Sequence, residues 1–412
     1  MTPATATRRI AVLAFIGGLG GGLVFPIIPA LGLQLGIPAF MIGLILSANR
    51  ISRLIFNVPA GHIIGRLGPR LTLGGALFVE SLGVLAYSAA LHFGHAMWWL
   101  LAGRAVFGIG TAFLFVGGQA FALGLSNKTD RGRKISTVRV AMSVAMPTGL
   151  VIGGVLADRF SDDVAFLTGA GITFFGALVA MILLPRSTST AIDEQAGSPT
   201  RGGIATLLAS PRFRFIAAAW GYNLLVFLTV QGVLLATLVI LVQKRHLYLF
   251  GMQAQGTSGL VMALLIGCSA VVTFSIGHTI DRLALRSTLV APSLVFLAGG
   301  FGLVGTAPTM PLLLLGTILI GISYNGVTLP MMALLGDATK KNEHGPAVGI
   351  YQLFGDIGGT IGPIAGIEIG VRIGLAPLYM GMAVLLLLAT GIAVWVRRQE
   401  RQLQILQTVS GN

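Results

Sequence analysis

The chain has 412 residues, of which 55% are hydrophobic and 10% are charged, and its mean hydropathy is +0.88. Soluble domains carry charge on about a quarter of their residues, so this composition excludes an ordinary soluble domain. The formal net charge of +14 lies mostly in loops between apolar blocks, so we expect no nucleic-acid partner. The composition predicts an all-α membrane protein.

Apolar blocks of about twenty residues, the length that a helix needs to cross the hydrocarbon layer, recur along the chain. Pro26 and Pro29 are expected to bend the first helix, and Pro330 the tenth. The first block lacks a small-residue cleavage site, so we expect this helix to be retained. Twelve transmembrane helices are expected, at residues 10–32, 39–60, 72–92, 97–123, 135–157, 164–185, 213–240, 256–277, 288–306, 310–334, 345–370 and 374–396.

Lysines and arginines outside these spans gather in alternate loops. One set of loops holds only Arg159, Lys244, Arg245 and Arg372. By the positive-inside rule the richer set is cytoplasmic, so we expect both termini in the cytoplasm and the protein in a bacterial inner membrane. The richer set is Arg8, Arg9, Arg66, Arg70, Lys128, Arg131, Arg133, Lys134, Arg186, Arg201, Arg212, Arg214, Arg282, Arg286, Lys340, Lys341, Arg397, Arg398 and Arg401.

One long stretch, residues 186–211, is rich in Ser, Thr, Gly and Pro and has no long apolar run. This composition is typical of a linker. We therefore expect an N-terminal six-helix bundle at 1–185, a cytoplasmic linker at 186–211, a C-terminal six-helix bundle at 212–397 and a cytoplasmic tail at 398–412.

The segment after the second predicted helix matches the segment after the eighth. Gly61-His62 and Gly277-His278 open the two segments, and Ile, Arg-Leu, Arg and Thr-Leu follow at equivalent positions. Tandem halves of this kind suit a carrier that opens alternately to each side of the membrane. Glycines also recur at one common offset, with Gly103, Gly108, Gly132, Gly149 and Gly153 matching Gly316, Gly321, Gly345, Gly362 and Gly366.

At these residues the chain resembles the major facilitator superfamily. The family's loop signature is Gly-x-x-x-Asp-Arg-x-Gly-Arg; here Gly65 replaces the Asp of the first copy and Ala284 the Gly of the second. The resemblance implies the MFS fold, with 12 transmembrane helices in two pseudo-symmetric six-helix bundles, and transport without enzymatic activity. The matching residues are Gly61, Arg66, Gly68 and Arg70 in the first copy and Gly277, Asp281, Arg282 and Arg286 in the second.

Two helix patterns extend the resemblance. Arg104 and Gly108 match the family's fourth-helix pattern, which implies a part for Arg104 in proton or substrate coupling. The segment 149–154 is similar to the fifth-helix pattern Gly-Pro-x-x-Gly-Gly of drug and proton antiporters, with Leu150 in place of Pro. The absent Gly-Pro pair appears in the other half, as Gly362-Pro363.

The resemblance also implies a gate at the loop signatures. Asp281 would lie near the cytoplasmic start of helix five, where free amide groups make a partial positive charge. Breaking that contact would favour opening on the cytoplasmic side. Gly65 provides no equivalent acid, so helix eleven would be held differently. The alternative is a plain tight turn with arginine anchors at the lipid headgroups.

Ionisable residues within the predicted spans are costly in hydrocarbon, so they normally face a cavity or a partner. Arg53 and Glu80 fall at similar depth on adjoining antiparallel helices, which predicts an ion pair. Arg139 lies near a helix end and is expected to snorkel to the interface. Glu368 could pair with Arg372 across one turn.

Asp356 and Arg50 fall at mid-depth on helices eleven and two, which the family fold places opposite each other. A carboxylate that is alternately bare and paired with arginine changes its affinity for protons. These residues are therefore candidates for a gate or proton site. The alternative is that Asp356 only satisfies polar neighbours such as Gln352 and Asn325.

Polar side chains within the spans need partners, and several are expected to line a central cavity. The sequence contains no phosphate-binding loop, nucleophile elbow or metal-ligand cluster, so we expect no enzymatic activity, cofactor or metal. The expected cavity residues are Gln119, Asn223, Tyr324, Asn325 and Gln352.

These features predict a secondary active transporter, and specifically a proton-coupled antiporter for efflux of small, partly apolar compounds. The expected partners are a small-molecule substrate, protons and the lipid bilayer, and the protein is expected to be a monomer. Two alternatives remain. The mid-span arginines outnumber the acids, which suits an organic anion or a lysolipid-like substrate, and a membrane receptor or scaffold would not transport at all.

Overall fold

The computed structural model describes residues 3–126, 131–185, 207–282, 285–340 and 343–410. Within these ranges the regular structure is entirely helical, which confirms the predicted fold class. The chain divides into two compact units: unit 1 is Met1–Ser198 with Leu238–Ala263, and unit 2 is Pro199–Thr237 with Leu264–Asn412. The predicted linker lies largely outside the described residues, and the predicted bundle boundaries stay a prediction.

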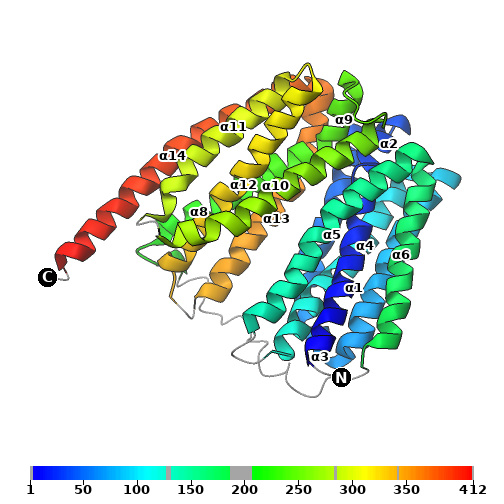
Figure 1. The fold of residues 1–412 in the computed structure, drawn as a ribbon, viewed down its shortest axis with the longest axis horizontal. Coiled ribbons are helices and arrows are strands. Elements are labelled where there is room, and N and C mark those ends of the chain that lie inside the picture. The colour runs from blue at the N-terminus through cyan, green and yellow to red at the C-terminus, as the bar shows by residue number, and fades with distance from the viewer. Residues whose placement is uncertain (1–2, 127–130, 186–206, 283–284, 341–342, 411–412) are drawn as a thin grey trace. The chain divides into compact units, whose positions relative to one another are not determined.

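Unit 1 contains the first six helices of the chain, with α1 packed among its neighbours (Figure 1). Its core gathers Leu13, Leu77, Leu114, Phe121 and other apolar side chains from these helices. The helices are α1 (Pro3–Val24), α2 (Ile28–Gln34), α3 (Ala39–His92), α4 (Ala96–Gly124), α5 (Arg131–Arg159) and α6 (Asp162–Leu183).

The first predicted span is broken where its prolines predicted a bend. α1 ends at Val24 and α2 begins at Ile28, with a turn between them in which the Ile27 amide donates to the Val24 carbonyl at 3.3 Å. A proline ring has no amide hydrogen and clashes with the preceding turn, so Pro26 cannot continue a regular helix. This break also places Phe25 in the turn between α1 and α2.

α3 contains two predicted spans, which meet at a sharp kink. Gly68 has φ 69° and ψ 171°, a backbone conformation that glycine adopts far more readily than other residues. Pro69 follows directly and also disfavours a helical residue before it. Gly68 of the first loop signature is thus required by the backbone conformation of the kink.

Glycines let α1 and α5 approach each other closely. A Cβ atom added to Gly153 would lie 1.9 Å from the Leu23 carbonyl oxygen, and one added to Gly22 would lie 2.4 Å from that of Met146. Small residues at helix interfaces are the usual means of close packing in membranes. The glycines of the fifth-helix pattern therefore have a packing role in this protein.

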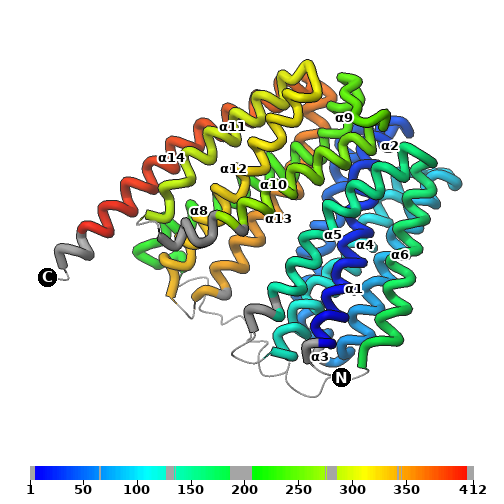
Figure 2. The backbone as a smooth tube through the Cα atoms, in the orientation of Figure 1, coloured from blue at the N-terminus to red at the C-terminus, as the bar shows by residue number. Residues whose placement is uncertain are grey.

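Unit 2 contains most of the remaining helices, while α9 and α10 have residues in both units. Figure 2 traces α14 past the beginning of α11. The elements are α8 (Phe213–Val226), η1 (Phe227–Leu234), α9 (Leu235–Arg245), α10 (Ala254–Arg282), η2 (Arg286–Leu289), α11 (Val290–Thr306), α12 (Met310–Ala338), α13 (His344–Arg372) and α14 (Leu375–Ser410).

Two features of these elements differ from the sequence-based prediction. The seventh span includes a π-helical segment, η1, where Gly232 packs against Gly362 of α13 closely enough that a Cβ would lie 2.6 Å from its Cα. Hydropathy does not reveal such a segment because its apolar pattern is unchanged. The twelfth helix continues to Ser410, so the predicted tail from residue 398 onward is largely helical.

Eleven helices of the described residues are long and apolar enough to cross a membrane. The remaining predicted span, the eleventh in order, is α13, which is 29 residues long but carries Asp356, Glu368 and Arg372. These charges and the many glycines of α13 lower its mean hydropathy. Eleven of the twelve predicted spans thus have the length and composition of membrane helices among the described residues, and α13 is the more polar twelfth.

Candidate functional site

A buried carboxyl group lies in the middle of unit 1. Glu80 of α3 is 0% exposed, and its Oε1 accepts a hydrogen bond of 3.0 Å from the Thr111 hydroxyl of α4. Its Oε2 has no hydrogen-bond partner among the described residues. Cβ atoms added to Gly17 and Gly110 would lie 2.8 Å from Oε2 and 2.6 Å from Cγ. Glycines on α1 and α4 thus make the room that this side chain occupies.

Arg104 of α4 lies in the same unit and is also buried, with 4% exposure. Its guanidinium carbon lies 5.8 Å from the ring centroid of Phe25, in the turn between α1 and α2. It also interacts electrostatically with the buried Tyr87 hydroxyl. The proline turn therefore brings an aromatic ring to the arginine that the fourth-helix pattern singled out.

Arg50 and Arg53 are half-buried on the first part of α3. The Arg53 guanidinium lies 5.8 Å from the ring centroid of Phe115 on α4. The hydrogen bond that the structure gives Glu80 is with Thr111. The predicted Arg53–Glu80 ion pair stays a prediction. Arg139 is exposed on α5, where a snorkelling side chain is expected.

Asp356 is half-buried on α13, one turn before Thr360, whose hydroxyl donates to the Asp356 carbonyl at 2.7 Å. The glycines around it face α8 and η1. A Cβ added to Gly355 would lie 2.6 Å from Asn223 Nδ2, and one added to Gly358 would lie 2.2 Å from the Leu224 carbonyl oxygen. Asp356 and Arg50 belong to different units, so their expected pairing stays a prediction.

Two expected cavity residues use their amides to join helices of unit 2. The Asn223 amide of α8 donates to the Tyr351 carbonyl of α13 at 2.6 Å and is 2% exposed. Asn325 of α12 donates to Ser269 Oγ at 2.7 Å and to Thr273 Oγ1 at 2.6 Å, both on α10. Asn223 would have to become uncovered to meet a substrate.

The remaining cavity candidates are less buried. Gln231 Nε2 donates to the Tyr324 hydroxyl at 3.4 Å, and the Tyr324 ring lies 6.3 Å from that of Phe227. Gln352 is exposed and Gln119 is half-buried. The expected cavity residues of unit 2 are thus Asn223, Tyr324, Asn325 and Gln352, whereas Gln119 belongs to unit 1.

The two loop signatures are described to different extents. In the first copy Arg66 is exposed, Arg70 is half-buried and Gly68 forms the kink of α3. In the second copy the backbone is helical to Arg282, but the side chains at 276–284, which include Asp281, lie outside the described set. The expected contact of Asp281 with helix five therefore stays a prediction.

The last residue of the second signature is held by two acids. The Arg286 Nε lies 3.1 Å from Asp337 Oδ2 of α12, and its amide donates to Glu400 Oε1 of α14 at 2.8 Å. Glu400 Oε2 also accepts from the amide of Ser287 at 3.1 Å. A carboxylate at the start of η2 satisfies amides that the helix leaves free.

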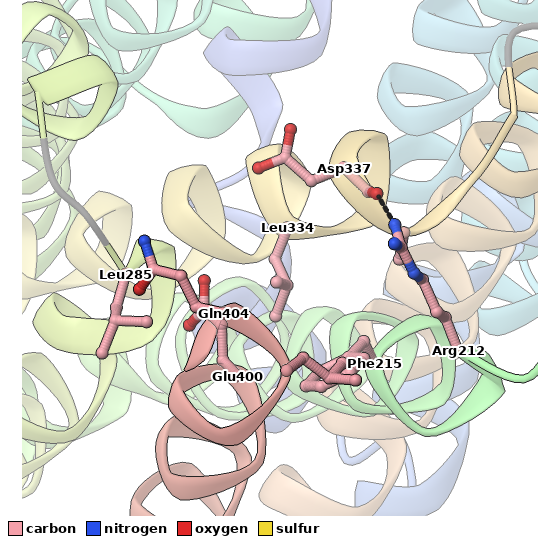
Figure 3. Close-up of a pocket in the computed structure, with 9 residues that line it drawn as sticks. Arg212, Phe215, Leu285, Leu334, Asp337, Glu400 and Gln404 are labelled. Carbon is pink, nitrogen blue, oxygen red and sulfur yellow. Dashed lines mark hydrogen bonds between the residues drawn. The ribbon is translucent and has the colours of Figure 1, made fainter. Parts of the chain in front are cut away.

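A pocket of about 350 Å³ lies beside these acids in unit 2 (Figure 3). Arg212 reaches across it to donate to the Asp337 carbonyl at 2.8 Å, as the dashed line in Figure 3 shows. Phe215, Leu334 and Leu403 make its apolar wall. No local sequence pattern predicts this pocket, because its residues come from four separate segments.

The sequence pattern described as Major Facilitator Superfamily matches residues 10–304 and 249–408, and the chain belongs to this superfamily. It is therefore a multi-pass membrane transporter of a small-molecule substrate and not an enzyme. The superfamily assignment and the MFS fold that were expected from the loop signatures are confirmed.

Curated relatives and solved structures agree with this assignment. The chain is similar to the Inner membrane transport protein YajR of Escherichia coli strain K12, with 23% identity over 88% of this chain and 78% of that protein. Multidrug resistance protein 1 of Bacillus subtilis strain 168 is also 23% identical, over 85% of this chain and 86% of that protein.

Among solved structures, a bacterial homolog of the human lysosomal transporter Spinster, in an inward-facing and occupied conformation, has a similar fold. The TM-score is 0.80 at 11% identity, and the alignment covers 96% of this chain and 97% of that one.

Proposed function

We propose that this protein is a proton-coupled exporter of small, partly apolar compounds that works by alternating access. The supporting observation is a pair of carboxyl groups within the spans, Asp356 in unit 2 and Glu80 in unit 1. An ionised carboxylate in hydrocarbon is costly, so its protonation depends on whether it meets water or a cation. A conformational change that alters this environment would bind or release a proton.

Asp356 is the leading proton-binding group in this proposal, and Glu80 is the second. Asp356 is only half-buried, so a proton can reach it more directly than it can reach the fully buried Glu80. The similarity to Multidrug resistance protein 1 of Bacillus subtilis supports an efflux substrate. Cytoplasmic termini, a monomeric state and two halves at 1–185 and 212–397 belong to the same proposal.

The test is flux in proteoliposomes with an imposed pH gradient. We expect Asp356→Asn to abolish proton-driven flux while substrate exchange across the membrane continues, because exchange needs no net proton movement. Glu80→Gln shows whether the second carboxyl shares the role. If both variants keep proton-driven flux at the level of the unmodified protein, the coupling proposal is wrong.

A second candidate function is the transport of an organic anion or a lysolipid-like compound. Arg50, Arg53 and Arg104, which fall within the predicted spans of unit 1, favour it, since positive charge attracts anions. Binding of matched anionic and cationic amphiphiles to the purified protein separates the two. Preferential binding of cations would eliminate this candidate, and binding without any flux would favour a receptor.

A further inference from the structure

The hydroxyl of Thr111 lies between two oxygen atoms of unit 1. Its Oγ1 is 3.0 Å from Glu80 Oε1 of α3 and 2.9 Å from the Phe107 carbonyl oxygen of its own helix, α4. A threonine hydroxyl has one hydrogen to donate and two lone pairs that accept. One hydrogen cannot form two full hydrogen bonds, so two contacts of this length need a second hydrogen.

The carbonyl of the preceding turn is the regular partner of a threonine hydroxyl within a helix. Thr148 on α5 makes this bond at 2.8 Å, and Thr173 on α6 makes it at 3.0 Å. When Thr111 does the same, its hydrogen points to the Phe107 carbonyl. A lone pair of Oγ1 then faces Glu80, and the hydrogen of that contact has to come from the carboxyl group.

The surroundings of Glu80 lead to the same hydrogen count. The side chain is 0% exposed, and its Oε2 has no hydrogen-bond partner among the described residues. A carboxylate only accepts hydrogen bonds, so burying it with one shared donor is costly. A protonated carboxyl with its hydrogen on Oε1 donates to Thr111 and leaves only a neutral carbonyl oxygen without a donor. The count therefore favours the protonated acid.

The helices packed around this carboxyl carry few ionisable groups. α1, where a Cβ on Gly17 would lie 2.8 Å from Glu80 Oε2, has none after Arg9, and α6 has them only in its first turn. α4 has one, Arg104, which interacts with Tyr87 of α3. Arg53 on the first part of α3 lies over an aromatic ring of α4. Both arginines thus have aromatic partners, whereas the hydrogen-bond partner of the carboxyl is neutral.

We propose that Glu80 carries a proton in this conformation and donates it to Thr111, which is its positioning residue. The hydrogen bonds then run from Glu80 Oε1 to Thr111 Oγ1 and on to the Phe107 carbonyl. When the Oε1–H bond breaks and the proton passes to water, the Thr111 hydroxyl turns its own hydrogen from the carbonyl to the carboxylate. The use of this proton in transport rests on the proposed coupling, but the protonation state does not.

Infrared spectroscopy separates the two states of Glu80, because a protonated carboxyl has a carbonyl stretching band that a carboxylate lacks. Purified protein in lipid nanodiscs is measured at neutral pH, where an exposed glutamate is ionised. We expect Glu80→Gln to remove one such band from the spectrum of the unmodified protein. The band should shift in heavy water, since the group carries an exchangeable hydrogen.

Two variants of Thr111 test its positioning role. Thr111→Val keeps the shape but removes the acceptor, so the band should move to the higher frequency of a carboxyl that donates no hydrogen bond. Thr111→Ser keeps the hydroxyl and should leave the band in place. The matched control is Glu368→Gln, which should remove no such band because Glu368 pairs with Arg372 at 2.5 Å and is ionised. A merely structural threonine would change stability but not the frequency of the band.

Identical spectra of the unmodified protein and Glu80→Gln would show an ionised Glu80 and overturn the proposal. So would an equal loss in Glu368→Gln, or the same frequency in Thr111→Val and Thr111→Ser. If Glu80→Gln does not fold, the two Thr111 variants provide the test. The spectrum is recorded without a gradient, so the two proposals fail separately: the band without proton-driven flux rejects the coupling, and flux without the band rejects only this inference.

Discussion

At the scale of single residues, Glu80 is the most unusual feature of unit 1. A fully buried carboxyl is tolerated only where its surroundings compensate for the loss of water. Here the Thr111 hydroxyl supplies a neutral polar partner. The absence of side chains at Gly17 and Gly110 leaves the room that the carboxyl fills, since a Cβ at either position would lie within 3 Å of the Glu80 side chain.

The Glu80–Thr111 contact should be measurable as a coupling energy. We expect a double-mutant cycle with Glu80→Leu and Thr111→Val to give about 1 kcal/mol, the scale of a hydrogen bond between membrane helices. Unfolding in detergent followed by circular dichroism measures the free energies.

The matched control for this cycle is Thr173→Val. Thr173 is also 0% exposed in unit 1, but its hydroxyl bonds the Gly169 carbonyl of its own helix at 3.0 Å. We expect no coupling between Thr173→Val and Glu80→Leu. A coupling as large as that of Thr111 would mean that the cycle reports general loosening of unit 1.

At the scale of elements, α5 is organised by glycines that face different neighbours. Gly153 lies on the backbone of α1, and Gly154 lies on the start of α10. The position of α5 is therefore set on one side by a helix of the core and on the other by the first turn of α10. A change at either glycine affects a different partner.

Gly153→Ala should destabilise the protein by about 2 kcal/mol, the typical cost of forcing an extra methyl into a packed interface. The added Cβ would meet the Leu23 carbonyl at 1.9 Å, and a backbone atom cannot move aside as a flexible side chain can. Chemical unfolding in detergent measures the effect.

Gly171→Ala on α6 is the control for this prediction, since no heavy atom lies within 4 Å of the added Cβ. Alanine also has the higher helix propensity, so this variant should be as stable as the unmodified protein or more so. Equal destabilisation of both variants would contradict the packing explanation.

At the scale of the whole molecule, the arrangement of charges makes a prediction about orientation. Nineteen lysines and arginines lie in the loops that we expect on the cytoplasmic side, and four lie in the opposite loops. Positive charge in short loops is retained in the cytoplasm during insertion, so both termini should lie on that side.

Reporter fusions test this topology. A fluorescent protein that matures only in the cytoplasm should be bright when it is fused after Asn412 and dark when it is inserted after Phe250, in a loop of the opposite set. The reverse pattern, or a dark fusion at the C-terminus, would contradict the predicted orientation and the cytoplasmic linker with it.

The sequence by itself determined the helical class, the approximate spans, the break at Pro26 and the family. These properties depend on local composition and on short motifs, because a span must be apolar throughout and a loop signature is contiguous. The sequence also identified Glu80, Arg104 and Asp356, since an ionisable residue within an apolar block is conspicuous whatever surrounds it.

The tertiary structure alone decided what each of these residues contacts. Thr111 beside Glu80, Phe25 beside Arg104 and Gly256 beside Asp158 come from different helices, and no local pattern places them together. The π-helical segment η1 likewise could not be predicted from the sequence, since it leaves the hydropathy pattern unchanged. Hydropathy records which segments leave water, whereas packing between helices depends on where small residues allow their backbones to meet.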